Sequence, residues 1–251
     1  MRHWWFRSVV AFQLLSPAAA AGAGPEPLAT DANLVTAIDV SGSVDGHAER
    51  LELLGMAAAL EHPAVLQAIA AGHHRRIGFA AFTWSSAGGA FIELVPWTFI
   101  ASAEDAARAA AALRAAHNLA PRFYAEPWRS PARRPWVPGL ATDISATIEH
   151  AIGLLRAAPY ASARQVINIC ANGRDNVGIG PDLARDRAAA AGIGINAVVL
   201  SREEAGLARY FWEHVRTGPD AFVIEVVGLP DLTDAMLRKF VTEIAWRWPA
   251  P

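Results

Sequence analysis

The feature that most constrains this chain is a regular alternation of short apolar runs with longer segments of helical periodicity. The runs typical of strands are Leu34–Ile38, Ile77–Thr83, Phe91–Val95, Gln165–Cys170, Gly194–Leu200 and Ala221–Val226. Ala87-Gly88-Gly89 predicts a hairpin between the second and third runs. Strands separated by helices form mainly parallel sheets. We therefore expect a Rossmann-like, doubly wound α/β fold, with a six-stranded sheet, one antiparallel edge strand and helices on both faces.

The segments between these runs show helical spacing of apolar residues or helix-starting residues. The expected helices span Asp45–Leu60, Ala64–Ala71, Ala103–Ala116, Ile144–Ala157, Pro181–Ala191, Glu203–His214 and Asp231–Ala245. Ser102 is suited to cap the third of these, because its hydroxyl can accept a bond from a free backbone N–H. Pro181 suits a first helical position.

The first residues have the composition of a secretory signal peptide. Arg2 and Arg7 precede the apolar stretch Val9–Leu15, and Ala21-Gly22-Ala23 matches an A-x-A cleavage site. An uncleaved N-terminal anchor is the alternative. We expect a signal peptide at 1–23, a short linker at 24–32 and one domain at 33–248, in a periplasmic or secreted protein. No later apolar run approaches the ~20 residues of a membrane span.

Charge and cysteine content exclude several classes of function. The net charge of −2 and the pI of 6.4 provide no general attraction to nucleic acid or to anionic membranes. The single cysteine, Cys170, lies in an apolar run, so no internal disulfide can form and a buried, inert thiol is expected.

The loop after the first strand carries the most specific motif, Asp39-Val40-Ser41-Gly42-Ser43. One carboxylate and two hydroxyls alternate by two residues at the end of a buried strand. These are hard oxygen ligands, suited to Mg²⁺, Mn²⁺ or Ca²⁺. Capping of the next helix is the alternative, although a cap uses only one such oxygen.

Two further loops belong to the same edge of the expected sheet, because ligand sites of open α/β sheets lie at the carboxyl ends of the strands. One loop contains Thr142 and Asp143, just before a helix. The other contains Asn172-Gly173-Arg174-Asp175-Asn176, after the fourth strand. Together the three loops could surround a single ion.

With these motifs, the chain resembles the von Willebrand factor A (vWA) family, and within it a group of uncharacterised bacterial exported proteins. The resemblance implies a metal-ion-dependent adhesion site (MIDAS), in which Asp39, Ser41, Ser43 and Thr142 surround a divalent ion, Mg²⁺ first. Neutral hydroxyl ligands leave the ion positive. An open coordination position then favours an acidic residue of a protein partner.

The third loop departs from the family pattern, which usually has Asp where Asn172 stands. Asn offers a carbonyl oxygen without negative charge, so metal affinity should fall. Asp175 could substitute as a ligand, or it could stabilise the turn. Asp143 is a less favoured substitute, because it is placed to cap the following helix.

A second departure is the Pro-, Arg- and Trp-rich insertion at about 118–140, which leads into Thr142. Arg and Trp are frequent binding anchors. The insertion could be a partner-contacting lid, or a surface loop folded onto its own domain. The cluster His73-His74-Arg75-Arg76 reads as a solvated turn, with a metal site as the alternative.

These features favour a binding module over an enzyme. No H-E-x-x-H, G-x-S-x-G or P-loop pattern is present. The alternatives are a Mg²⁺-dependent hydrolase, with Asp143 or Asp175 as general base, and a vWA-like domain that has lost its metal.

Overall fold

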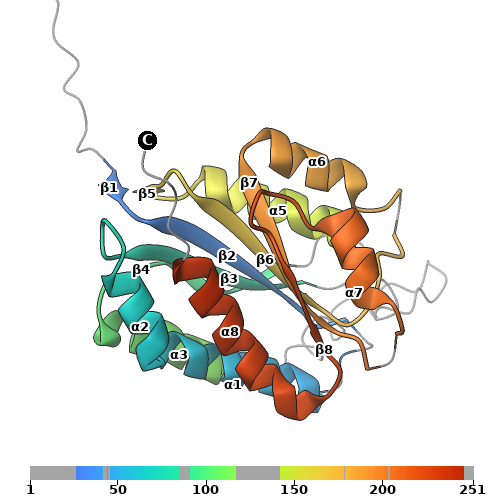
Figure 1. Cartoon of the computed structure of the whole chain (residues 1–251), viewed down its shortest axis with the longest axis horizontal. Helices are drawn as coiled ribbons and strands as arrows, with labels where there is room; N and C mark the ends of the chain where they lie inside the picture. Colours follow the sequence, from blue (N-terminus) through green and yellow to red (C-terminus); the bar gives the residue numbers. More distant parts are fainter. Residues whose placement is uncertain are drawn as a thin grey trace, which may run out of the picture.

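The computed structural model describes residues 27–41, 44, 46–84, 91–116, 142–177, 179–202 and 204–245. Its main sheet has six strands in the order β4-β3-β2-β6-β7-β8. Five strands are parallel, and β4 pairs antiparallel with β3 at one edge. The expected fold class is confirmed (Figure 1).

The strands of the main sheet are β2 (Ala32–Asp39), β3 (Ile77–Trp84), β4 (Phe91–Ile100), β6 (Gln165–Ala171), β7 (Ile193–Leu200) and β8 (Val223–Val226). A separate two-residue parallel pairing joins β1 (Leu28–Ala29) to β5 (Tyr160–Ala161). The helices are α1 (Gly46–Glu61), α2 (Pro63–Ala70), α3 (Ala103–Ala115), α5 (Ile144–Arg156), α6 (Asp182–Ala190), α7 (Leu207–Tyr210) and α8 (Leu232–Ala245).

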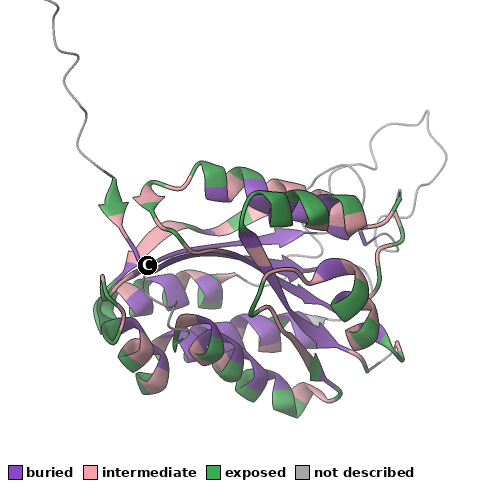
Figure 2. Ribbon diagram, turned by 45° about the horizontal axis from the view of Figure 1, so that its top comes forward, coloured by how far each residue is buried: buried purple, intermediate pink, exposed green. Residues whose placement is uncertain are grey.

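Helices cover both faces of the sheet, with α1, α2, α3 and α8 on one side and α5, α6 and α7 on the other (Figure 1). Alternate residues of β2 serve the two cores: Leu34 and Ile38 pack with α1 and α8, whereas Val35 and Ala37 pack with α5. Every residue of β2 is buried, as expected for a central parallel strand (Figure 2).

Two elements differ from the expectation. Strand β4 continues through Pro96 to Ile100, which an edge strand tolerates because it needs hydrogen bonds on one side only. The helix expected from Glu203 begins only at Leu207, because Gly206 adopts a left-handed φ of 78° that no helix can include. It then widens into a π-helical turn, Phe211–Val215.

The helix starts follow the capping residues. The Ser102 side chain accepts from Asp105 N, and the Asp143 side chain accepts from Ala146 N. Pro181 precedes α6 as its cap residue, one position earlier than expected. Among the described residues no single helix is long and apolar enough to cross a membrane. The segments His47–Glu61 and Pro63–Ala70 together have the length and composition of a membrane span, but the chain bends by 51° between them.

Cys170 is fully buried, as expected. Burial, and secondarily the nearby Glu52 carboxylate, raises the pKa of the thiol. The thiolate is the reactive form, so we expect the folded protein to resist thiol reagents. A colorimetric disulfide reagent at pH 8 should modify less than about a tenth of the protein in an hour, and one thiol per chain in guanidinium chloride. Rapid reaction of the folded protein would show that Cys170 is accessible.

Candidate metal-binding face

The candidate site lies where the strand order reverses. From β2 the chain proceeds to β3 and β4 on one side, and later to β6, β7 and β8 on the other. Because β2 pairs with β6, with Ile38 opposite Cys170, the loops after these strands emerge side by side. These carboxyl ends lie on the right in Figure 1. A ligand site is expected at such a switch point.

Asp39, the last residue of β2, is fully buried. Its Oδ1 accepts from Ser41 N at 2.7 Å, and its Oδ2 makes no well-formed hydrogen bond to a described residue. Burial raises the pKa of Asp39 from 3.8 to about 6, although bonds from Ser41 and from the backbone of Asn172 act in the opposite direction. The site therefore holds a buried carboxyl group whose charged form lacks full compensation.

Thr142 is 4 % exposed and lies against the third loop. Its backbone N donates to Asn176 Oδ1 at 2.7 Å, and its carbonyl accepts from Asn176 N at 3.0 Å. A Cβ placed on Gly173 would lie 3.7 Å from Thr142 Oγ1, so the hydroxyl sits next to the backbone of that glycine. The hydroxyl of the second loop is thus held beside the third.

Both carboxylate oxygens of Asp175 accept hydrogen bonds from backbone N–H groups. Its Oδ2 accepts from Ile144 N at 2.8 Å and Ser145 N at 3.2 Å, and its Oδ1 accepts from Val177 N at 3.1 Å. Asp175 therefore joins the third loop to the start of α5, which immediately follows Thr142. This favours the turn-stabilising interpretation, and Asp175 as a ligand stays a prediction.

We expect Asp175→Ala to destabilise the protein by about 1–2 kcal/mol, because three backbone donors lose their acceptor, two at the start of α5 and one in the third loop. Urea denaturation measures the change. Asp186→Ala removes an exposed aspartate on α6 and should change stability by less than about 0.5 kcal/mol. Equal stability of the two variants would contradict the joining role.

Two buried acids on α1 were not singled out from the sequence. Glu49 and Glu52 are 2 % and 3 % exposed, and Glu52 Oε2 has no hydrogen bond to a described residue. Burial, and then the charges of Asp39 and Glu49, raise the pKa of Glu52 well above its usual range. The signal available was their position: they are three apart on the helix that directly follows the motif, and so share one face.

Glu204, in the loop after β7, was also missed. Its Oε1 lies 2.6 Å from Arg174 Nε, and its Oε2 accepts from Arg174 N at 3.2 Å. A Cβ on Gly173 would be 3.8 Å from Glu204 Oε2. The Arg174 guanidinium also lies 5.3 Å from the Tyr210 ring centroid. Its position in the sequence, just after the strand β7, could have indicated that it lies at the carboxyl ends of the strands, where ligand sites form.

The structure thus brings Asp39, Ser41, Thr142 and the third loop with Asn172 to one edge of the sheet. Ser43 and the insertion at 118–140 fall outside the described residues. No group of three or more His, Cys, Asp or Glu side chains in the described ranges could hold a metal ion. A site of one carboxylate and several hydroxyls would not contain such a group.

The strand order and the helices on both faces are those of the vWA fold. The chain belongs to the family described as "Protein of unknown function (DUF1194)", whose model matches residues 29–125 and 130–248. No curated protein sequence matches the chain.

Solved structures share the fold at low sequence identity. Proximal thread matrix protein 1 from the mussel byssus, with a zinc-occupied MIDAS motif, is 14 % identical with a TM-score of 0.58, over 87 % of this chain and 48 % of that one. The vWF domain of the pilus tip protein Mfa5 from Porphyromonas gingivalis is 10 % identical with a TM-score of 0.54, over 89 % and 99 %. The pilus adhesin SpaC from Lactobacillus rhamnosus GG is 12 % identical with a TM-score of 0.56, over 86 % and 31 %. The chain thus spans about half of the mussel protein.

Proposed function

We propose that this chain is an exported vWA-type module that binds a protein partner through a face holding a divalent ion, Mg²⁺ in the first place. The observation that carries the proposal is Asp39, a fully buried carboxyl group with Oδ2 unsatisfied among the described residues. A buried polar atom without a partner calls for an explanation, and a bound ion supplies one. The charges of Asp39 and Glu49 raise the pKa of the buried Glu52, so Glu52 favours its neutral form, and a cation at Asp39 would relieve the repulsion among these acids.

The donor set suits a hard ion. Asp39, Ser41, Ser43 and Thr142 would hold it, with the Asn172 side-chain carbonyl as a neutral fifth donor. When bound, the ion would supply an open position for a carboxylate. Asp175 would keep the second and third loops in register rather than contact the ion.

The relatives support this choice of function over catalysis. One structural neighbour has a zinc-occupied MIDAS motif, and two others are a pilus tip protein and a pilus adhesin. The byssus and pilus origin of these structural neighbours also supports an exported location for this chain. No observation in the described part of the chain favours the Mg²⁺-dependent hydrolase, because Asp143 and Asp175 both accept backbone hydrogen bonds.

Peptide selection tests the partner chemistry. Displayed random peptides selected on the immobilised protein in Mg²⁺ should share an Asp or Glu and should be released by EDTA. The Thr142→Ala variant should select no such peptides, whereas Ser162→Ala, at the opposite edge of the sheet, should behave like the wild type. Acidic peptides that remain bound in EDTA would indicate a vWA-like face that works without metal.

A further inference from the structure

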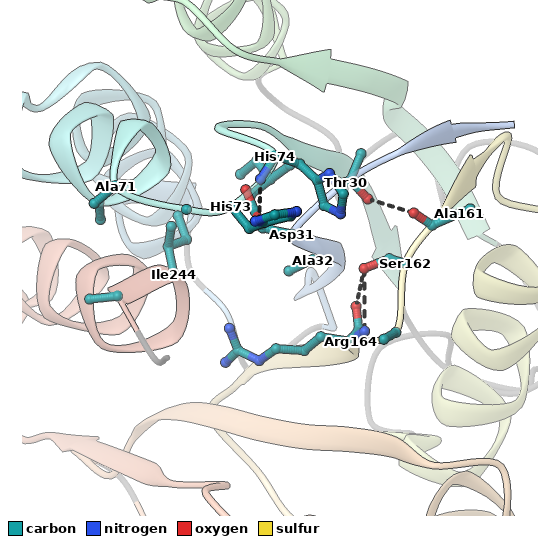
Figure 3. Close-up of a pocket in the computed structure, with 15 residues that line it drawn as sticks. Thr30, Asp31, Ala32, Ala71, His73, His74, Ala161, Ser162, Arg164 and Ile244 are labelled. Atoms are coloured by element: carbon teal, nitrogen blue, oxygen red, sulfur yellow. Dashed lines mark hydrogen bonds between the residues drawn. The ribbon is translucent and has the colours of Figure 1, made fainter. Parts of the chain in front are cut away.

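A second candidate site lies at the amino ends of the parallel strands, where β2, β3 and β6 begin, opposite the candidate metal-binding face. A cavity of about 900 Å³ opens there between the α2–β3 loop, the segment before β6 and the end of α8. This volume is within the usual ~300–1,000 Å³ range of small-molecule pockets. Figure 3 shows the cavity and the residues around it.

The wall of the cavity combines an apolar part with one half-buried cationic group, the Arg164 guanidinium. Ala32, Ala68, Ile77 and Ile244 are among the apolar lining residues. The side chain of Arg164, the residue just before β6, reaches towards α8 (Figure 3). Most drug-sized ligands bind to walls of this kind, where a few polar groups fix the orientation of an apolar body.

The Arg164 guanidinium is only partly used by the protein. Its Nη1 donates to the backbone carbonyl of Glu243 in the last turn of α8. Among the described residues, Nε and Nη2 have no hydrogen-bond acceptor. Burial lowers the pKa of Arg164, while the charges of Glu243 and Asp220 act in the opposite direction. A guanidinium with free donors and reduced hydration binds carboxylate or phosphate oxygens well.

Two acidic side chains near the cavity, Asp31 and Glu243, already accept hydrogen bonds from other groups of the protein. Asp31 accepts from His74 N at 2.8 Å and from Arg76 N at 3.1 Å, so its carboxylate holds the loop at the start of β3. This loop is packed closely, since a Cβ on Gly72 would lie 2.2 Å from Asp31 Oδ2. The Glu243 carboxylate bonds to Asn168 and Asn196 and lies 3.4 Å from Lys239 Nζ. His73 and His74 add no negative charge to the wall.

We propose that this cavity binds a small organic acid, with its oxyanion on the Arg164 guanidinium and its apolar body along the alanine- and isoleucine-lined wall. The His73-His74 segment, interpreted from the sequence as a solvated turn, forms one side of the site. The site is separate from the metal-binding face, because the two lie at opposite ends of the parallel strands.

Calorimetric titration of the full chain, with EDTA present to silence the metal-binding face, tests the proposal. Octanoate and octyl phosphate are the probes, and their relative affinities distinguish a carboxylate from a phosphate head. At least one should bind with 1:1 stoichiometry. Octanol, which has no charge, and inorganic phosphate, which has no apolar body, should both bind at least about tenfold more weakly.

Two variants locate the binding. Arg164→Gln should weaken the better probe at least about tenfold, whereas Arg238→Gln, an exposed position on α8, should leave it unchanged. Ala68→Trp fills the apolar part and keeps Arg164, so it should abolish binding without unfolding the protein. It also separates this cavity from a smaller one of about 250 Å³ that Arg164 lines but Ala68 does not.

The following results would overturn the proposal: no binding of either probe at millimolar concentration, octanol binding as tightly as octanoate, or full binding by Ala68→Trp. If Arg164→Gln fails to fold, the Ala68→Trp and octanol results still decide.

Discussion

In metal-free buffer at pH 8, the Asp39→Asn variant should be more stable than the wild-type protein. Burial raises the pKa of Asp39 from 3.8 to about 6, which corresponds to about 3 kcal/mol between its two protonation states. The folded state therefore holds the Asp39 proton more tightly than the unfolded state does. This contribution favours folding below about pH 4, and it is lost as the pH rises to about 6.

Asn has no charge to bury and keeps an oxygen that can accept from Ser41 N. We expect a gain of up to about 3 kcal/mol at pH 8 and little difference at pH 4, measured by urea denaturation in EDTA. With Mg²⁺ in hundredfold excess over its dissociation constant, the wild type should gain about 2.7 kcal/mol and Asp39→Asn almost nothing. A variant less stable than the wild type in EDTA at pH 8 would show that the buried charge is compensated.

Replacing Lys239 by Met should be the most destabilising single change proposed. Lys239 and Glu243, one turn apart on α8, are 1 % and 0 % exposed. Glu243 accepts from Asn168 Nδ2 at 3.1 Å and Asn196 Nδ2 at 2.6 Å, and Lys239 Nζ is 3.4 Å from Glu243 Oε2. Met fills a similar volume but leaves a buried carboxylate without its cation, which typically costs about 3–5 kcal/mol.

Equilibrium unfolding at pH 7 measures this loss. Arg238→Met, the exposed neighbour on the same helix, should change stability by less than about 0.5 kcal/mol. A loss below about 1 kcal/mol for Lys239→Met would mean that the amides of Asn168 and Asn196 are sufficient for the Glu243 carboxylate.

The sequence predicted the strands and helix starts well because they depend on local chemistry. A short run rich in β-branched residues such as Leu34–Ile38 favours a buried strand, and Ser102 and Asp143 cap helices through bonds to residues three positions away. The late start of α7 depends on the backbone conformation of Gly206, which composition does not reveal. The β1–β5 pairing joins residues too distant in sequence for any local pattern to indicate.

The part of the candidate site that lies at the ends of strands could be predicted from the sequence. Asp39 ends β2 and Asn172 follows β6, and the pairing of these two strands brings the residues together. Glu52 and Lys239 were not predictable in the same way. On a helix, Lys239 and Glu243 look like an ordinary exposed pair four residues apart, and only packing against the polar residues of β6 and β7 shows that they are buried.

The central claim is that a divalent ion binds at the end of β2. A crystal structure of the full chain grown in Mn²⁺, with an anomalous difference map, tests it most directly. We predict one strong peak within coordination distance, about 2–2.5 Å, of oxygens from the Asp39–Ser43 loop and from Thr142. A map without a peak there, from crystals in saturating Mn²⁺, would contradict the claim.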